Sequence, residues 1–159
     1  MSGTSATSAE PSVTGSSGTG PFVHLVPLRW TDQDAYRHVN HARIVTLIEE
    51  ARVALAFTGA GEEGMTGFAS GLLVAGLHVD YKRQLPWRAE PLRVEITVRD
   101  LRAASFTLDY VLRDGSGADD PVAVTAWTSM ALYDLEAQRV RRITGDERDY
   151  LRRFLGEVS

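Results

Sequence analysis

The chain has 159 residues, of which 43% are hydrophobic, and 17 Lys and Arg against 21 Asp and Glu give a formal net charge of -4. This length is typical of one domain with a hydrophobic core, and the acidic balance disfavours nucleic-acid or anionic-membrane binding. The lack of cysteine excludes disulfides, thiolate nucleophiles and cysteine-ligated metals. With no 18-residue apolar run and no basic, apolar leader, we expect a cytoplasmic protein without a membrane span.

The N-terminal segment differs in composition from the rest of the chain. Residues 1–20 are almost entirely Ser, Gly, Thr, Ala and Pro, which bury too little surface to offset the entropy of ordering. We therefore predict a disordered tail over 1–20 and a single domain over 21–159. A first strand is expected over Phe22–Leu28, with Pro27 near its end.

One helix follows the first strand. Five apolar residues recur at the spacing of a single helix face, and these are Ile44, Leu47, Ile48, Ala51 and Leu55. The pattern predicts a buried helix from Ala42 to about Phe57, with Asn40 as its N-cap. The glycine-rich stretch Gly59–Gly64 is expected to end the helix.

The second half of the chain changes to the two-residue period of strands. Residues 92–98 alternate apolar and polar side chains, and residues 106–112 repeat the pattern. Two longer apolar runs cover Leu72–Lys82 and Val122–Tyr133, and a short terminal helix is expected over Asp146–Leu155. One strand, one helix and four strands in meander order predict an α+β fold in which the helix lies across an antiparallel sheet.

The most informative segment lies between the first strand and the helix. It resembles the motif of the hot-dog-fold acyl-CoA thioesterases of the 4-hydroxybenzoyl-CoA thioesterase type, through Arg29, Trp30, Asp32, Asp34, His38, Val39, Asn40, Glu49, Ala51 and Arg52. The resemblance implies one long central helix wrapped by an antiparallel five-stranded sheet. It also implies hydrolysis of an acyl-CoA or acyl carrier protein thioester, no cofactor other than the coenzyme A of the substrate, and a homodimer or homotetramer.

The same resemblance implies roles for the motif residues. Asp34 matches the catalytic carboxylate, as a nucleophile on the thioester carbonyl or as a general base for water. The backbone N–H of His41 is the candidate oxyanion donor. His38 and Asn40 are candidates for positioning water or the thioester oxygen, although an N-cap role for Asn40 and a loop-fixing role for His38 need no substrate.

Further candidates lie beside this core set. Glu49 lies on the helix, where another branch of these thioesterases carries its carboxylate, but we favour the interpretation that it forms an ordinary surface pair with Arg52. Asp32 is interpreted as structural and as a partner of Arg29. A substrate-binding set, in which the two cations face the phosphates of coenzyme A, is Tyr81, Lys82 and Arg83.

Three positions depart from the motif. Arg37 stands where glycine is usual, His41 replaces a common Asn, and Ile44 replaces a common Tyr. These changes keep open the alternative of a hot-dog protein that binds acyl thioesters without cleaving them. A hot-dog hydratase or dehydratase is a further, more distant alternative. No histidine and acid cluster has metal-binding spacing, so we predict no metal.

Overall fold

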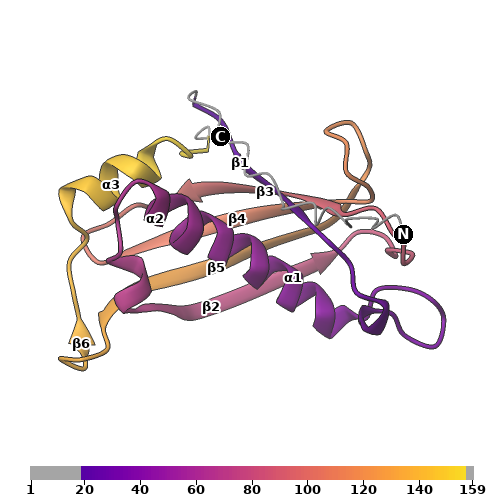
Figure 1. Cartoon of the computed structure of the whole chain (residues 1–159), viewed down its shortest axis with the longest axis horizontal. Helices are drawn as coiled ribbons and strands as arrows, with labels where there is room; N and C mark the ends of the chain where they lie inside the picture. Colours follow the sequence, from indigo (N-terminus) through magenta and orange to yellow (C-terminus); the bar gives the residue numbers. More distant parts are fainter. Residues whose placement is uncertain (1–18, 157–159) are drawn as a thin grey trace, which may run out of the picture.

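The computed structural model describes residues 19–156, so most of the predicted disordered tail lies outside the described residues. The principal elements, shown in Figure 1, are β1 (Phe22–Val26), η1 (Trp30–Asp32), α1 (His41–Val53), η2 (Ala54–Gly59), α2 (Ala60–Glu62), η3 (Phe68–Ser70), β2 (Leu72–Tyr81), β3 (Leu92–Arg99), β4 (Ser105–Arg113), β5 (Val122–Asp134), β6 (Arg139–Val140) and α3 (Gly145–Arg152).

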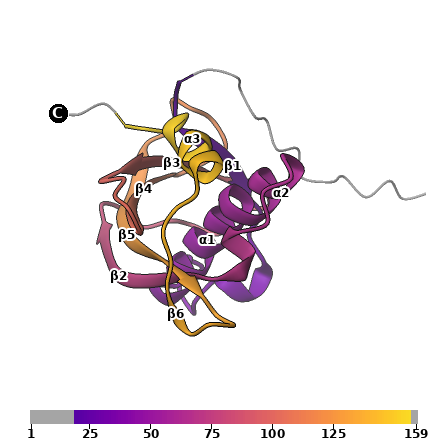
Figure 2. The ribbon, with the colours of Figure 1, turned by 90° about the vertical axis from the view of Figure 1, so that its left-hand side faces the viewer.

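The strands form one antiparallel sheet that curls around α1, as Figure 2 shows. The order of the five longer strands is β1-β3-β4-β5-β2, and the two-residue β6 pairs with β5. The predicted hot-dog architecture, an α+β fold with a long helix wrapped by an antiparallel sheet, is therefore confirmed.

The predicted meander order is wrong for one strand. β3, β4 and β5 are consecutive neighbours, but β2 pairs with the far side of β5, from Leu72 opposite Leu132 to Tyr81 opposite Val124. The connection from β2 to β3 consequently crosses to the other side of the β4–β5 pair. This placement makes β2 an edge strand of the sheet.

The core lies between α1 and the concave face of the sheet. All five residues of the predicted helix face are buried, with at most 2% of their surface exposed. The apolar residues that alternate along β3 and β4 are also at most 2% exposed, and they are Leu92, Val94, Ile96, Val98, Phe106, Leu108, Tyr110 and Leu112. The two periodicities therefore located both halves of the core correctly.

The helix is longer than predicted. α1 continues through the π-helical turn η2 into α2 and ends at Glu62, so the glycines at 59 and 61 lie inside it. Gly59 has no space for a side chain, since an added Cβ would lie 2.6 Å from the hydroxyl oxygen of Tyr150. Gly64 adopts a φ of 79°, the left-handed conformation that ends helices.

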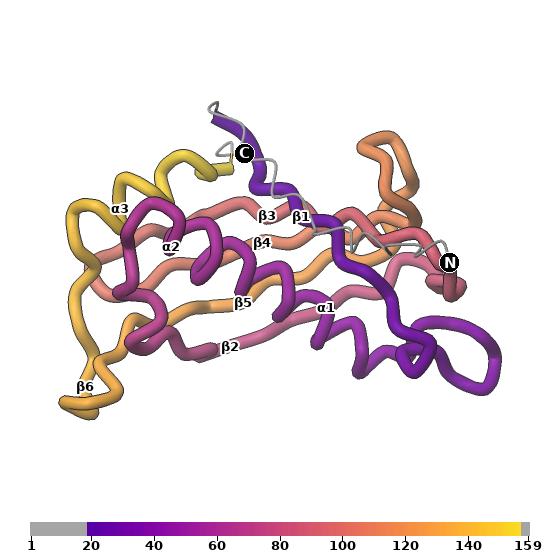
Figure 3. Tube along the Cα trace, viewed as in Figure 1, coloured from indigo at the N-terminus to yellow at the C-terminus, as the bar shows by residue number. Residues whose placement is uncertain are grey.

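The chain brings two distant segments to the N-terminal end of α1. Figure 3 shows the connection after β1 running to this end, where β2 also finishes. The hydroxyl of Tyr81, the last residue of β2, donates a hydrogen bond of 3.0 Å to the carbonyl of His41. Among the described residues, no helix is both long enough and apolar enough to span a membrane.

Candidate active site

The loop from Gln33 to Val39 is a tight turn organised by Asp34. The backbone N–H of Asp34 donates to the carbonyl of His38 at 2.8 Å, and Gln33 and Val39 form an antiparallel bridge. The Oδ1 atom of Asp34 accepts the backbone N–H groups of Tyr36, at 2.8 Å, and His38, at 3.1 Å. No hydrogen bond within the described residues uses Oδ2, so one carboxylate oxygen holds the loop and the other remains available.

Arg37 occupies the glycine position of the motif and has a positive φ. Its φ of 61° lies in the left-handed region, and its N–H donates to the carbonyl of Asp34 at 3.1 Å. An L-residue with a side chain pays roughly 1–2 kcal/mol for this conformation. The loop therefore retains the positive backbone angle that the motif's glycine accommodates, at a cost that glycine would avoid.

Asp32 is a structural residue, as its sequence position indicated. It is 2% exposed, its carboxylate accepts the backbone N–H of Arg29 at 2.7 Å, and its carbonyl accepts the N–H of Asn40 at 2.8 Å. The predicted pairing with the Arg29 side chain is wrong, because that guanidinium pairs with Glu50 on α1. Burial raises the pKa of Glu50 above its ordinary value, and Arg29 offsets this only in part.

A second segment, residues 85–87, fixes the loop from the other side. The N–H of Val39 donates to the carbonyl of Leu85 at 2.7 Å, and the N–H of Trp87 donates to the carbonyl of Arg37 at 2.9 Å. The indole N–H of Trp87 donates to the carbonyl of Arg29 at 2.9 Å. These hydrogen bonds link residues 85–87 to the chain on both sides of Asp34. They therefore hold in place the loop that carries the Asp34 carboxylate.

The N-terminus of α1 follows the loop directly. Asn40 is its N-cap, with Oδ1 accepting the N–H of Ala42 at 2.9 Å and its carbonyl accepting those of Arg43 and Ile44. No hydrogen bond within the described residues engages the N–H of His41. This free N–H at the positive end of the helix dipole is suited to an oxygen that gains negative charge.

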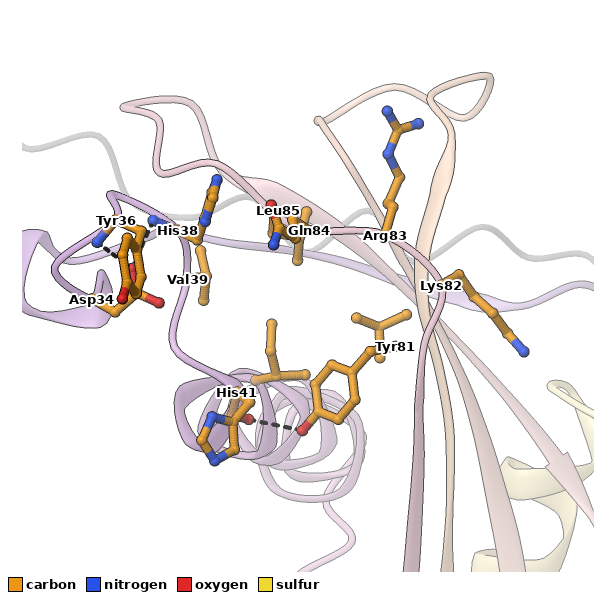
Figure 4. A pocket seen from close by; sticks show the side chains of 12 residues that line it. Asp34, Tyr36, His38, Val39, His41, Tyr81, Lys82, Arg83, Gln84 and Leu85 are labelled. Carbon is orange, nitrogen blue, oxygen red and sulfur yellow. Dashed lines mark hydrogen bonds between the residues drawn. The ribbon is translucent and has the colours of Figure 1, made fainter.

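A cavity of about 590 Å³ lies between the loop, the start of α1 and the end of β2. Its lining includes six of the residues proposed from the sequence, which are Asp34, His38, His41, Tyr81, Lys82 and Arg83. Figure 4 shows Asp34 on one side of this space and Tyr81 on the other, with its hydroxyl toward the carbonyl of His41. The structure therefore gathers most of the predicted set around one space.

Two predicted residues lie elsewhere. Asn40 is outside the cavity lining, because its side chain caps the helix. The Glu49 side chain is 61% exposed and lies 3.6 Å from the Arg52 guanidinium, which is the surface pair that its spacing suggested. Neither Asn40 nor Glu49 lines the cavity, and a catalytic role for either stays a prediction.

The two cations of the predicted substrate set are already paired with carboxylates. Lys82 Nζ lies 3.9 Å from Asp80, and Arg83 Nε lies 3.6 Å from Asp114. In Figure 4 both side chains extend away from the cavity, so only their backbone and proximal atoms border it. Contact with substrate phosphates at the cavity rim remains a prediction for both residues.

Sequence reasoning missed several lining residues. They are Tyr36, Gln84, Leu85 and Val124, whereas Val39 and Ile44, which also line the cavity, were already singled out as motif positions. Tyr36 lies inside the motif, and its position in the loop was the available signal. Val124 comes from β5, which only the sheet order brings to this place. The described residues contain no group of three or more His, Asp or Glu side chains arranged to hold a metal.

Comparisons with known proteins agree with this geometry. The sequence pattern of the thioesterase-like superfamily matches residues 28–149, which span the Asp34 loop, the helix and all the longer strands after it. The chain belongs to this superfamily. No curated protein sequence matches the chain.

Several solved structures have the same fold. A thioesterase superfamily protein from Jannaschia sp. CCS1 is 17% identical with a TM-score of 0.69, covering 84% of both chains. The PA5185 protein of Pseudomonas aeruginosa is 18% identical with a TM-score of 0.73, covering 86% of this chain and 93% of its own. Slr0204, a 1,4-dihydroxy-2-naphthoyl-CoA thioesterase from Synechocystis, is 14% identical with a TM-score of 0.68, covering 83% and 96%.

Proposed function

We propose that this protein hydrolyses an acyl-CoA thioester to a carboxylic acid and free coenzyme A, as the 4-hydroxybenzoyl-CoA type of hot-dog thioesterase does. One observation carries the proposal: Asp34 lines a cavity beside the N-terminus of α1, and no hydrogen bond from residues 19–156 engages either its Oδ2 atom or the first N–H of that helix. Superfamily membership and the thioesterase named among the structural neighbours support thioester hydrolysis in general.

In the proposed reaction, Oδ2 of Asp34 starts the attack on the thioester carbonyl. As a nucleophile it forms an acyl–aspartyl anhydride and expels the thiolate of coenzyme A, and water then cleaves the anhydride. As a general base it removes a proton from water, which adds to the carbonyl before the thiolate leaves. In both routes the carbonyl oxygen becomes negative and accepts the N–H of His41. The reaction needs no metal or redox cofactor.

The remaining motif residues have supporting roles in this proposal. His38 lines the cavity and positions water or the thioester oxygen, while Asn40 acts indirectly by capping the helix that carries the His41 N–H. Tyr81 fixes the same turn through the His41 carbonyl. Lys82 and Arg83 lie at the rim, where they exchange their carboxylate partners for the phosphates of the carrier.

The proposal includes a homodimer, or a tetramer built from dimers, in the cytoplasm. β2 is an edge strand, and an unprotected edge favours pairing with a second strand. Three of its apolar side chains, Leu73, Val74 and Leu77, are 42–46% exposed. A second copy pairing along this edge would cover them and extend the sheet.

The decisive experiment measures free thiol released from short, long and aromatic acyl-CoAs by the unmodified protein and by Asp34→Asn. The amide oxygen of Asn still accepts the N–H groups of Tyr36 and His38, so the loop is retained while the charge is lost. We expect at least a hundredfold loss of turnover with coenzyme A binding preserved. Unchanged cleavage in the variant would refute the carboxylate mechanism.

A second candidate function is acyl-thioester binding without cleavage. The observation that favours it is the commitment of Asp34 Oδ1 to two backbone N–H groups, which explains the residue as a loop brace. An enzyme specific for acyl carrier protein thioesters would also fail to cleave acyl-CoAs. Acyl carrier protein thioesters are therefore included in the same assay. Binding of both carriers with cleavage of neither would support this second function.

A further inference from the structure

Residues 29–39, which include the Asp34 loop, are joined to the body of the central helix by one ion pair. The guanidinium of Arg29 donates to the carboxylate of Glu50 on α1. Within the described part of the chain, no other hydrogen bond or ion pair connects a side chain of α1 to this segment. The pair therefore links the segment that carries Asp34 to the helix that carries the His41 N–H.

The backbone of Arg29 is a junction of hydrogen bonds. Its N–H donates to Asp32 Oδ2 at 2.7 Å, and its carbonyl accepts the N–H of Asp32 at 3.0 Å and the indole N–H of Trp87 at 2.9 Å. The carbonyl of Asp32 in turn accepts the N–H of Asn40, the N-cap of α1. A displacement of Arg29 is therefore transmitted to both ends of the Asp34 loop.

The charges around Glu50 make this ion pair sensitive to pH. The Glu50 side chain is 33% exposed, and the charged groups that face it are Arg29 and Asp32, together with Glu49 on its own helix. Burial raises the pKa of Glu50 above its ordinary value, and the attraction of Arg29 offsets this only in part. Glu50 therefore takes up its proton at a milder acidity than an exposed glutamate does, and it then loses the charge that attracts Arg29.

We propose that Glu50 is a positioning residue of the proposed hydrolysis: ionised, it holds Arg29 and thereby fixes Asp34 relative to the His41 N–H, and protonated, it releases them. This inference rests on the proposed function of Asp34. Glu50 does not line the cavity, so it acts on the reaction through Arg29. Cleavage needs the Asp34 carboxylate and the His41 N–H at one thioester carbonyl, and a small misplacement of either lowers kcat.

An exposed ion pair would not have this effect, because its partners stay hydrated and contribute little. The pair of Glu63 with Arg153 is of this kind, with the two side chains 46% and 43% exposed. Glu50 lies deeper, and it faces the carboxylate of Asp32, which is 2% exposed. An ionised Glu50 therefore depends on the positive charge of Arg29 beside it.

The kinetic test uses Glu50→Gln, because glutamine resembles a glutamate that stays protonated at every pH. With the acyl-CoA that is cleaved fastest, we expect kcat at neutral pH to fall about threefold to tenfold and KM to change less than about twofold. Arg29→Gln should cause the same loss, and the double variant should lose no more than either single variant. Glu63→Gln, which alters the exposed pair with Arg153, is the matched control and should retain full activity.

Two further measurements separate positioning from a purely structural role. As the pH falls, kcat of the unmodified protein should approach that of Glu50→Gln, because both proteins then have a neutral side chain at position 50. The Tm of Glu50→Gln should not fall at neutral pH, since a carboxyl group whose pKa is raised by folding stabilises the fold in its protonated form. A fall in Tm that parallels the loss of kcat would overturn the inference.

Amide hydrogen exchange of residues 32–40, compared at one pH, reports on the loop without requiring cleavage. The bonded N–H groups of this segment, among them those of Tyr36 and His38, should exchange faster in Glu50→Gln. Asp34-dependent cleavage with an unchanged kcat in Glu50→Gln would overturn the inference and leave the proposed function standing. If the unmodified protein cleaves no thioester, the proposed function fails. Faster exchange in Glu50→Gln would then still support the link from Glu50 to the loop, and unchanged exchange would refute it.

Discussion

Glu147 is a buried acid whose replacement should measurably destabilise the protein. Its side chain is 3% exposed, and its two oxygens accept Arg141 at 2.7 and 2.9 Å and the N–H of Thr144 at 2.9 Å. Glu147→Gln keeps the shape but leaves the Arg141 guanidinium without its counter-charge. Breaking a buried pair costs about 3–5 kcal/mol, and since Arg141 is 19% exposed we expect about 2–3 kcal/mol.

The effect should depend on pH with a definite sign. Burial alone would raise the pKa of Glu147, but hydrogen bonds from Arg141 and from the Thr144 backbone hold this pKa below its usual value of 4.5. The stabilisation is therefore complete above pH 4.5 and is lost as the pH falls through the lower pKa of the folded state. The difference in stability between the unmodified protein and Glu147→Gln should therefore disappear in acid.

The assay is thermal unfolding followed by circular dichroism from neutral pH into acid. At neutral pH a loss of about 2–3 kcal/mol corresponds to a fall in Tm of about 5–10 °C for a chain of this length. Glu136→Gln, which alters an exposed acid outside any ion pair of the described residues, is the control and should change Tm by less than about 2 °C. The ion pair would not stabilise the protein as argued if Glu147→Gln and the unmodified protein had the same Tm at neutral pH. The same conclusion would follow if their difference in Tm stayed constant down to the lowest pH.

Three further outcomes are expected. Asn40→Ala removes the N-cap of α1 and should cost about 1 kcal/mol in urea unfolding; an unchanged midpoint would mean that the cap contributes nothing. Arg37→Gly relieves the left-handed strain of the loop and should stabilise the protein by up to about 1 kcal/mol, whereas a lower Tm would indicate that the arginine side chain holds the loop. Leu77→Lys places a charge on the β2 edge and should convert dimers to monomers in light scattering, and a persistent dimer would move the interface elsewhere.

The sequence predicted the fold where one local rule decides the structure. The alternation in β3 and β4 and the helix face around Leu47 need only the periodicity of each element. The sheet order was harder, because the pairing of β2 with β5 joins residues 43 to 60 positions apart and no local pattern records it. The helix end was mistaken because Gly59 serves close packing against Tyr150 rather than termination.

The site was predictable to a similar degree. A motif of neighbouring residues located the Asp34 loop and the helix N-terminus beside it. The pairing of Arg83 with Asp114 was not visible, since the two residues are 31 positions apart. Trp87 braces the Asp34 loop through hydrogen bonds to the carbonyls of Arg37 and Arg29, and these contacts again depend on tertiary structure.

Asp34 also lines a separate cavity of about 600 Å³, which Trp30, Gln33, Ala35, Arg37 and Trp87 border with it. The loop that carries Asp34 is therefore common to two spaces. If a ligand in one space shifts this loop and so changes the affinity of the other space for its own ligand, thermodynamic reciprocity makes the change equal in both directions.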